Sequence, residues 1–145
     1  MIIIVTFKLM KDDKCILYLT ERTIKHIKFI SPKVKDMLRQ LTRDIELTIK
    51  VDNSDLDELF SEKKDDSDEA LPREIDSVRD LLVYAVFPAN GQYSYLDGEL
   101  EIVDGYTKSV SKYSYKDLFV MKFEESFKKD ARDTHMFITL REWER

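Results

Sequence analysis

The ten residues Arg43–Asp52, RDIELTIKVD, contain the clearest secondary-structure signal in the chain. Apolar side chains alternate with polar ones along the stretch, which is the period of a β-strand with one buried face. The apolar set is Ile45, Leu47, Ile49 and Val51, and the polar set is Glu46, Thr48 and Lys50. We therefore predict a half-buried strand here, and we interpret the other segments around it.

Segments on both sides of this strand also favour extended structure. MIIIVTFKLM (1–10) and CILYLTE (15–21) flank a polar KDDK and predict a hairpin. Downstream, β-branched and aromatic residues predict strands in LLVYAVF (81–87), ELEIVDGY (99–106), TKSVSKYSY (107–115), SYKDLFVMKFE (114–124) and THMFITLREW (134–143). Asn90-Gly91 and Asp97-Gly98 are strong hairpin-turn signals. TIKHIKFI (23–30) fits a helix or a strand, and its β-branched content favours the strand.

One segment, SPKVKDMLRQLTRD (31–44), has a helical pattern. Ser31 can cap the helix, Pro32 suits its first position, and apolar residues recur at helical spacing from Val34 to Leu41. ESFKKDARD (125–133) forms either a helical turn or a polar connection. Eight or nine short strands with hairpin turns predict a mainly β fold with minor α, a closed or nearly closed antiparallel barrel.

Composition restricts the class of protein. A chain of 145 residues suits one domain over 1–145, and 43% hydrophobic with 37% charged residues indicates a globular protein. The net charge of −5 argues against a protein that coats nucleic acid. Cys15 is the only cysteine, which excludes an internal disulfide and fits a reducing compartment. No apolar run approaches the ~20 residues of a membrane span and no signal peptide is evident, so we expect an intracellular protein.

Acidic residues are concentrated between Asp52 and Asp76. That segment has eleven Asp and Glu residues against three basic ones, a net charge of −8, which leaves +3 for the rest of the chain. Its centre, SEKKDDSDEALP (61–72), has few large apolar side chains and cannot offset the entropy lost on ordering. We predict a long, mobile acidic loop over 52–76, which is either a solvated linker or an arm for a basic partner.

Residue types used in catalysis or metal binding are present, but their spacing indicates no site. His26 and His135 are far apart in sequence, and Cys15 is more typical of a small buried residue than of a nucleophile. The doublets Asp12-Asp13 and Asp65-Asp66 lack the spacing of a calcium loop. The three glycines form no phosphate-binding loop. We expect no enzymatic activity and no cofactor.

Tyrosines are frequent in the strands predicted after the acidic loop. They are Tyr84, Tyr93, Tyr95, Tyr106, Tyr113 and Tyr115. With the scattered lysines Lys108, Lys112 and Lys116, they could stack single-stranded bases. The alternative is that they pack across strands and cover the sheet, because tyrosine favours β-structure.

The order of these features resembles the eighth-subunit family shared by the eukaryotic nuclear RNA polymerases I, II and III. The parallel segments are IKFISPKV (27–34), DIELTIKVD (44–52), the acidic loop and IDSVRDLLVYAVF (75–87). SYKDLFVMKFE stands where that family has a Ser-Tyr-Gly-Gly-Leu-Leu-Met-Arg-Leu motif, and MFITLRE (136–142) stands at its closing strand.

Six positions match this family's motifs: Ser114, Tyr115, Met121 and Lys122, and before them Asp76 and Tyr84 of the earlier strand. The chain departs from the family pattern at Lys116-Asp117, which replaces the two glycines, and at Ala85, which replaces a third. One residue is inserted before Met121, and the linker after ISP is longer.

The resemblance implies an OB-like barrel of about eight strands with one short helix and a protruding acidic loop. It implies a non-catalytic structural subunit that docks on the largest subunit of nuclear RNA polymerase and supports its assembly for transcription, with no cofactor and no sequence-specific nucleic-acid binding of its own. Its partner-binding residues would be Tyr84, Tyr113, Ser114, Tyr115 and Lys122. The alternative is a free-standing acidic regulator, a viral inhibitor or an immunity-type protein, that binds a basic partner through the acidic loop.

The strand predicted at SYKDLFVMKFE also carries an expectation about its two faces. If alternation runs through it without interruption, Phe119 and Met121 face the core while Leu118 and Val120 lie on the opposite face.

Overall fold

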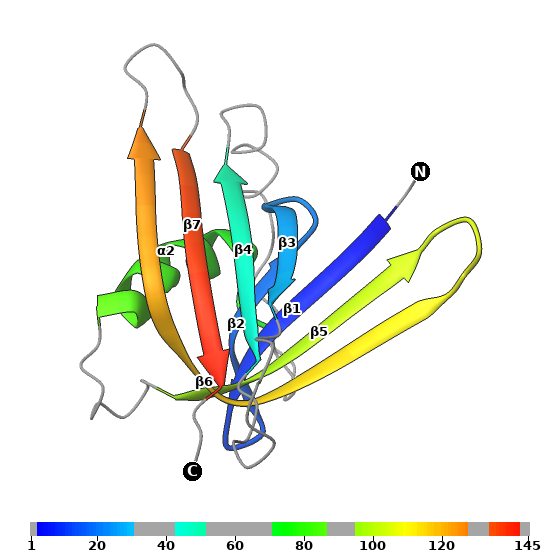
Figure 1. The fold of residues 1–145 in the computed structure, drawn as a ribbon, viewed down its shortest axis with the longest axis horizontal. Coiled ribbons are helices and arrows are strands. Elements are labelled where there is room, and N and C mark those ends of the chain that lie inside the picture. Colours follow the sequence, from blue (N-terminus) through cyan, green and yellow to red (C-terminus); the bar gives the residue numbers. More distant parts are fainter. Residues whose placement is uncertain (1–2, 31–42, 52–70, 87–94, 128–133, 143–145) are drawn as a thin grey trace, which may run out of the picture.

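The computed structural model describes residues 3–30, 43–51, 71–86, 95–127 and 134–142. These residues form seven strands and one helix (Figure 1). The strands are β1 (Ile3–Lys11), β2 (Lys14–Thr20), β3 (Ile24–Ile30), β4 (Asp44–Val51), β5 (Leu96–Asp104), β6 (Val110–Phe127) and β7 (Thr134–Glu142). The helix, α2 (Glu74–Val86), lies between β4 and β5 in the chain.

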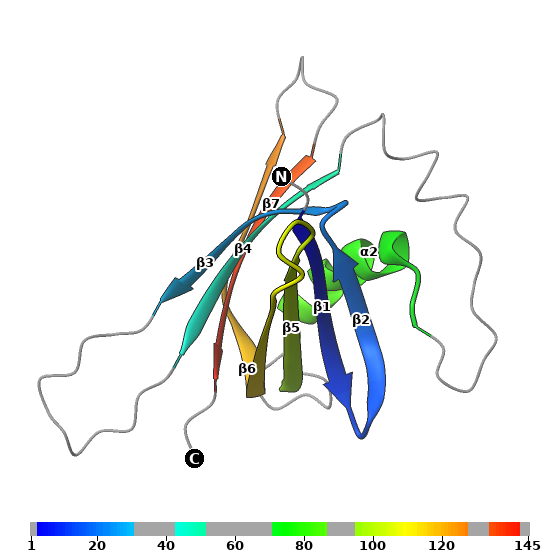
Figure 2. The same ribbon diagram turned by 90° about the vertical axis from the view of Figure 1, so that its right-hand side faces the viewer.

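All seven strands belong to one antiparallel sheet in the order β2-β1-β5-β6-β7-β4-β3. The predicted mainly β, antiparallel class is therefore confirmed. The prediction of a closed barrel is wrong, because the sheet stays open with β2 and β3 at its two edges. Among the described residues it has seven strands rather than about eight. Figure 2 shows that the sheet bends sharply, with β2, β1 and β5 on one side and β7, β4 and β3 on the other.

The long strand β6 connects the two halves of the bent sheet. Its residues Val110 to Leu118 pair with β5, and its residues Leu118 to Phe127 pair with β7. The register of β6 shifts opposite Leu96/Gly98 of β5, and it shifts again between Val120 and Lys122. At the first irregularity Asp117 has a positive φ of 52°. Extra residues of this kind bend a strand and increase its twist, which accounts for the change of direction.

Alternation along the strands builds the core that the two halves enclose. Ile45, Leu47 and Ile49 of β4 are buried, so the predicted face of this strand is confirmed. Alternate residues of β7, Met136, Ile138 and Leu140, are buried as well. The completely buried side chains of the remaining elements are Phe7, Leu9, Leu17, Leu19, Leu81, Leu96, Leu100 and Leu118. Burial of such side chains stabilises the fold by about 1.5–3 kcal/mol each.

The expected faces of SYKDLFVMKFE are wrong. Leu118 is completely buried, whereas the side chain of Met121 is 44% exposed. Tyr115 pairs with Gly98 and Leu118 with Leu96, so three steps on β6 correspond to two on β5. The extra residue lets Tyr115 and Leu118 both face the core, which reverses the alternation that follows.

The strand predicted at LLVYAVF is also wrong, because this segment belongs to α2. Val78, Leu81 and Tyr84 recur every three residues and are buried together on one face of the helix. The acidic residues Glu74 and Asp76 occupy the first turn, where they favour the positive end of the helix dipole. Residues 74–76 therefore belong to this helix and not to the acidic loop.

The turns of the sheet are predicted in part. The β1–β2 hairpin is confirmed, and Asp12 and Asp13 form its turn with φ values of 51° and 63°. Residues 23–30 are confirmed as strand, over Ile24–Ile30. Asp97-Gly98 is not a turn but part of β5. The helix predicted at 31–44 lies outside the described residues, except that Arg43 precedes β4 and Asp44 begins it. The acidic stretch 52–70, Asn90-Gly91 and residues 128–133 also lie outside the described residues.

Candidate functional site

Two of the residues predicted to contact a partner are buried. The hydroxyl of Tyr84, on α2, donates a 2.6 Å hydrogen bond to the backbone oxygen of Leu118, and burial raises the pKa of this phenol. Tyr115 is also buried, and burial raises the pKa of its phenol as well. Both rings therefore connect parts of the core and have little surface to offer to a partner.

Ser114 and Tyr115, in the interior of β6, belong to a cluster that joins this strand to the start of β4 and the end of β7. The guanidinium of Arg43 lies 4.7 Å from the centre of the Tyr115 ring. It donates hydrogen bonds of 2.7 Å to the backbone oxygen of Ser114 and to Oε1 of Glu142. The backbone nitrogen of Lys116 donates to Oε2 of the same carboxylate at 3.1 Å. Each member of this cluster has a partner, so the arrangement is suited to fixing the strand ends.

Tyr113 and Lys122 lie apart from this cluster. The Tyr113 ring is half-buried on the inner face and packs on Phe29 with 4.8 Å between ring centres. Lys122 is exposed on the far half of β6, where its ammonium lies 3.0 Å from Glu124. Tyr113, Ser114 and Tyr115 are consecutive on β6, but Ser114 is exposed whereas the two tyrosines lie on the inner side, so the five predicted residues do not form one continuous surface.

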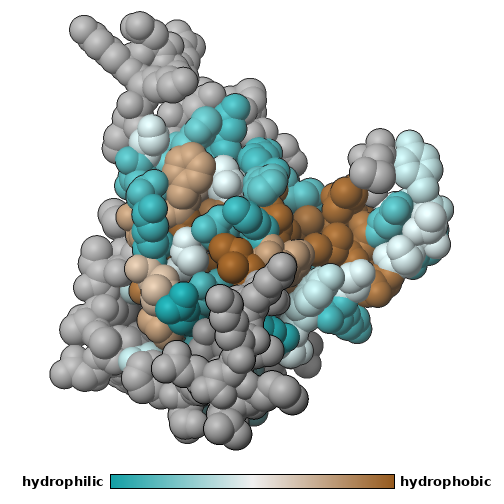
Figure 3. Space-filling view, viewed as in Figure 1, coloured by the Kyte–Doolittle hydropathy of each residue, from teal (hydrophilic) through white to brown (hydrophobic). Residues whose placement is uncertain are grey.

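A different surface is more suited to binding a partner. The start of β1, the end of β5 and the start of β6 form a three-stranded arm that projects from the rest of the sheet (Figure 1). On its outer face Ile4 pairs with Val103, and Val103 pairs with Val110. Ile4 is 45% exposed and Val110 is 51% exposed, and Figure 3 shows apolar side chains gathered along this arm. Val103, between Ile4 and Val110, is half-buried. An apolar row across three strands with exposed residues at both sides is typical of an interaction surface.

A groove of about 460 Å³ adjoins this apolar row on the same outer face. The next residues of each strand line it, and they are Thr6 and Lys8 of β1, Glu99 and Glu101 of β5, and Lys112 and Ser114 of β6. The Lys112 ammonium lies 3.9 Å from the Glu101 carboxylate. We name the apolar row and this groove the arm face. An apolar centre beside mixed charges is the composition of many protein interfaces.

The start of β1 contains a sequence signal of the arm face. In MIIIVTF both sets of alternate residues are apolar at the start of β1, whereas a strand with one buried face needs only one apolar set. Ile4 is therefore apolar on the outer face, where β1 extends beyond the core.

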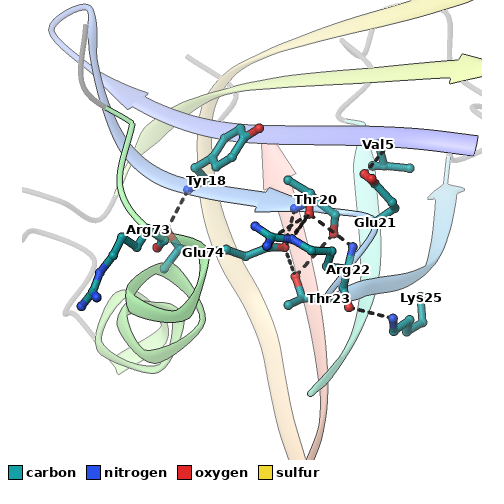
Figure 4. Close-up of polar contacts among 10 residues, drawn as sticks. Val5, Tyr18, Thr20, Glu21, Arg22, Thr23, Lys25, Arg73 and Glu74 are labelled. Atoms are coloured by element: carbon teal, nitrogen blue, oxygen red, sulfur yellow. Dashed lines mark hydrogen bonds and ion pairs between the residues drawn. The ribbon is translucent and has the colours of Figure 1, made fainter. Parts of the chain in front are cut away.

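A second group of polar residues surrounds Glu74 at the start of α2 (Figure 4). Its buried carboxylate accepts hydrogen bonds from the hydroxyls of Thr20 and Thr23, both at 2.7 Å, and lies 2.9 Å from Nη2 of Arg22. A neighbouring contact joins the same two elements: the backbone nitrogen of Tyr18 on β2 donates to Oγ of Ser77 on α2 at 3.0 Å. These contacts attach α2 to β2, and a carboxylate so fully paired is suited to a structural role.

The described residues contain few other groups that are suited to catalysis or metal binding. They include no group of three or more His, Cys, Asp or Glu side chains that could hold a metal ion. Burial raises the pKa of the Cys15 thiol to about 11, so it is protonated at neutral pH and a poor nucleophile. In the part of the chain that the structure describes, no helix has the length and apolar character needed to cross a membrane.

No protein-family model and no curated protein matches this sequence.

Proposed function

We propose that this protein is a non-catalytic structural subunit that binds a larger protein through its arm face. The observation that carries this proposal is the apolar row formed by Ile4, Val103 and Val110 on a projecting part of the sheet, in which Ile4 and Val110 are exposed and Val103 is half-buried between them. Burial of such a row against a partner contributes roughly 25 cal/mol for each Å² of apolar surface removed from water. Obligate interfaces are built in this way.

The partner that the order of sequence features favours is the largest subunit of a nuclear DNA-directed RNA polymerase. Ser114, Tyr115, Met121 and Lys122 support this choice, because they match the Ser-Tyr motif of the eighth-subunit family. The helix α2 stands where the resemblance implies a tyrosine-bearing strand, so this region departs from the implied barrel. In this proposal catalysis and the magnesium ion belong to the partner, and the protein supports assembly of the enzyme in the nucleus.

A second candidate function rests on charge distribution. The sequence between Asp52 and Asp76 has a net charge of −8, whereas the rest of the chain has +3. A free-standing inhibitor of a basic partner would use this segment. Exposed charges are screened beyond about 8 Å at physiological ionic strength, so such binding weakens steeply as salt rises.

Partner capture distinguishes the two functions. The tagged chain is expressed in its source cells, captured at low and at high salt, and the bound proteins are identified by mass spectrometry. We expect polymerase subunits at both salt concentrations. They should remain when all acidic residues of 52–70 are changed to amides, and they should be lost for Val110→Glu. If capture is lost when the acidic segment is neutralised but not for Val110→Glu, the result would support the inhibitor instead.

The matched control is Phe137→Glu, which places the same charge on another exposed apolar residue, on β7 and outside the arm. Capture by this variant should equal capture by the natural chain. Melting temperatures of both variants are measured first, so that a folding defect is not taken for a binding defect. Equal loss for Val110→Glu and Phe137→Glu would contradict a docking surface on the arm.

A further inference from the structure

The two edges of the open sheet are treated differently. At β2, the backbone nitrogens of Tyr18 and Thr20 donate to Ser77 and Glu74 of α2, at 3.0 Å and 2.7 Å. The helix thus occupies hydrogen-bonding groups of that edge strand. At the other edge, β3 pairs with β4 and, within the described residues, with no other strand. An edge strand presents a row of backbone donors and acceptors to which another strand can bind.

The side chains of β3 divide by face. Ile27 and Phe29 lie opposite Leu47 and Ile45, on the inner face. Ile27 packs against the core, but Phe29 is 44% exposed although its ring contacts Tyr113. The inner face of this edge therefore ends in apolar surface that one more strand would cover.

The outer face of β3 is basic at His26 and Lys28 and ends at the half-buried Ile30. His26 and Lys28 point outward, opposite Thr48 and Glu46 of β4, and both are exposed. Lys25 is exposed as well, and its ammonium donates a 2.7 Å hydrogen bond to the backbone oxygen of Arg22. No acidic residue occurs within β3 itself. Glu46 is on β4, on the opposite side of Lys28 from the free edge. A strand added at that edge would lie next to Lys28 but two strand spacings, about 10 Å, from β4 and Glu46.

We propose that the β3 edge binds an extended acidic peptide of another protein by strand addition. The peptide alternates apolar and acidic residues. Its apolar side chains cover Ile27 and Phe29, and its carboxylates lie beside Lys28 and His26. Backbone hydrogen bonds supply affinity in this mode and the alternate side chains supply specificity. This surface is separate from the arm face, so the inference does not depend on the proposed function.

Charge selects this occupant over a second copy of the chain. Two β3 strands paired across a symmetry axis would bring His26 and Lys28 of one copy beside the same basic residues of the other, and like charges facing each other across strands are destabilising. Lysines on an edge strand also serve to prevent aggregation. An edge built only for protection would carry a charge at the inward positions too, whereas Ile27 and Phe29 are apolar.

The probe is a fluorescent eight-residue peptide of alternating Asp and Ile, with binding measured by anisotropy. Two further peptides carry N-methyl groups on alternate residues. In the first peptide the methyl groups block the amides along one edge of the extended chain, and in the second they block the amides along the other edge. Strand addition uses the amides of one edge only. We therefore expect one N-methylated peptide to lose saturable binding and the other to retain it. Amide exchange in residues 24–30 should slow with the peptide that binds.

Charge is tested with Lys28→Glu, which should weaken binding of the unmodified peptide about fivefold or more, since cross-strand ion pairs contribute up to about 1 kcal/mol and the substitution replaces attraction by repulsion. Lys14→Glu, at the exposed start of β2, is the control of equal charge and should bind like the natural chain. The proposal is overturned if binding is absent at millimolar peptide, if both N-methylated peptides bind equally, or if an alternating Lys-Ile peptide binds as well.

Discussion

The carboxylate of Glu74, in the first turn of α2, accepts 2.7 Å hydrogen bonds from both the backbone nitrogen and the hydroxyl of Thr20, the last residue of β2. Residues 54 positions apart thereby hold the helix against an edge of the sheet. Arg22 pairs with the same carboxylate, so its charge is neutralised where it is buried.

Replacement of Glu74 should be strongly destabilising. Glu74→Ala leaves the hydroxyls of Thr20 and Thr23 and the Arg22 guanidinium without their shared acceptor, and we expect a loss of about 3–5 kcal/mol in the free energy of unfolding. Urea denaturation measures it. Asp76→Ala is the control: that carboxylate occupies the same helical turn but pairs with arginines near the surface, so its loss should stay below about 1 kcal/mol.

Leu118→Ala and Met121→Ala should differ sharply, although the two residues lie on the same strand. Leu118 is completely buried, so its truncation should cost about 2–5 kcal/mol. Met121 is 44% exposed, and its truncation should change stability by no more than about 0.5 kcal/mol. Thermal or urea unfolding of both variants measures the difference. Similar losses would mean that the bend in β6 is absent in solution.

Gly98→Ala should destabilise the chain by about 1–3 kcal/mol, as overpacking of a core does. A Cβ at this position would lie 2.5 Å from Cδ1 of Leu118, whose side chain is enclosed and cannot easily move away. A double-mutant cycle with Leu118→Ala measures the coupling: once the leucine is truncated, the added methyl group should cost much less. Additive losses would show that the clash is relieved by another movement.

Acid should weaken the cluster that contains Glu142. Burial raises the pKa of this carboxyl, but hydrogen bonds from the Arg43 side chain and the Lys116 backbone outweigh burial and leave the pKa below its ordinary value of 4.5. A lowered folded-state pKa stabilises the protein above the unfolded-state value, and this contribution is lost as pH falls through the folded-state pKa.

The measurement is urea unfolding between about pH 6 and about pH 3. In Arg43→Ala the pKa of Glu142 should return toward its ordinary value, so the loss of stability in acid should be shallower than in the natural chain. Lys122→Ala, which removes an exposed ion pair, should leave the slope unchanged. An identical slope for Arg43→Ala and the natural chain would rule out a stabilising role for this ion pair.

Much of the sheet could be predicted from sequence because alternation is local. In β4 and β7 every second residue is apolar, and these residues are buried except for the half-buried Val51 at the end of β4. The β1–β2 hairpin follows from a polar turn between two apolar segments. The helix α2 was missed, although Glu74 and Asp76 in its first turn and the three-residue spacing of Val78, Leu81 and Tyr84 were available in the sequence. A run of β-branched and aromatic residues outweighed that pattern, and propensity is a weak guide where packing decides.

The candidate surfaces were predictable only in part. Ser114 and Lys122 were expected at a partner and lie at the surface, whereas Tyr84 and Tyr115 are buried. Tyrosine suits a core and an interface equally well, because its ring is apolar and its hydroxyl needs one partner. The arm face arises where β1, β5 and β6 extend beyond the core, and strand length alone does not indicate which residues do so.

The mainly β class and the buried residues of the regular strands follow from the amino-acid order, because side-chain alternation depends only on neighbours along the chain. Three features follow only from the folded chain: the sheet is open, α2 covers the β2 edge through Glu74, and Leu118 rather than Met121 faces the core. Each of these depends on contacts between residues distant in sequence. The extra residue in β6 sets which side chains of that strand face the core, and the buried Glu74 carboxylate sets the position of α2. Neither alters the alternating pattern of the neighbouring strands.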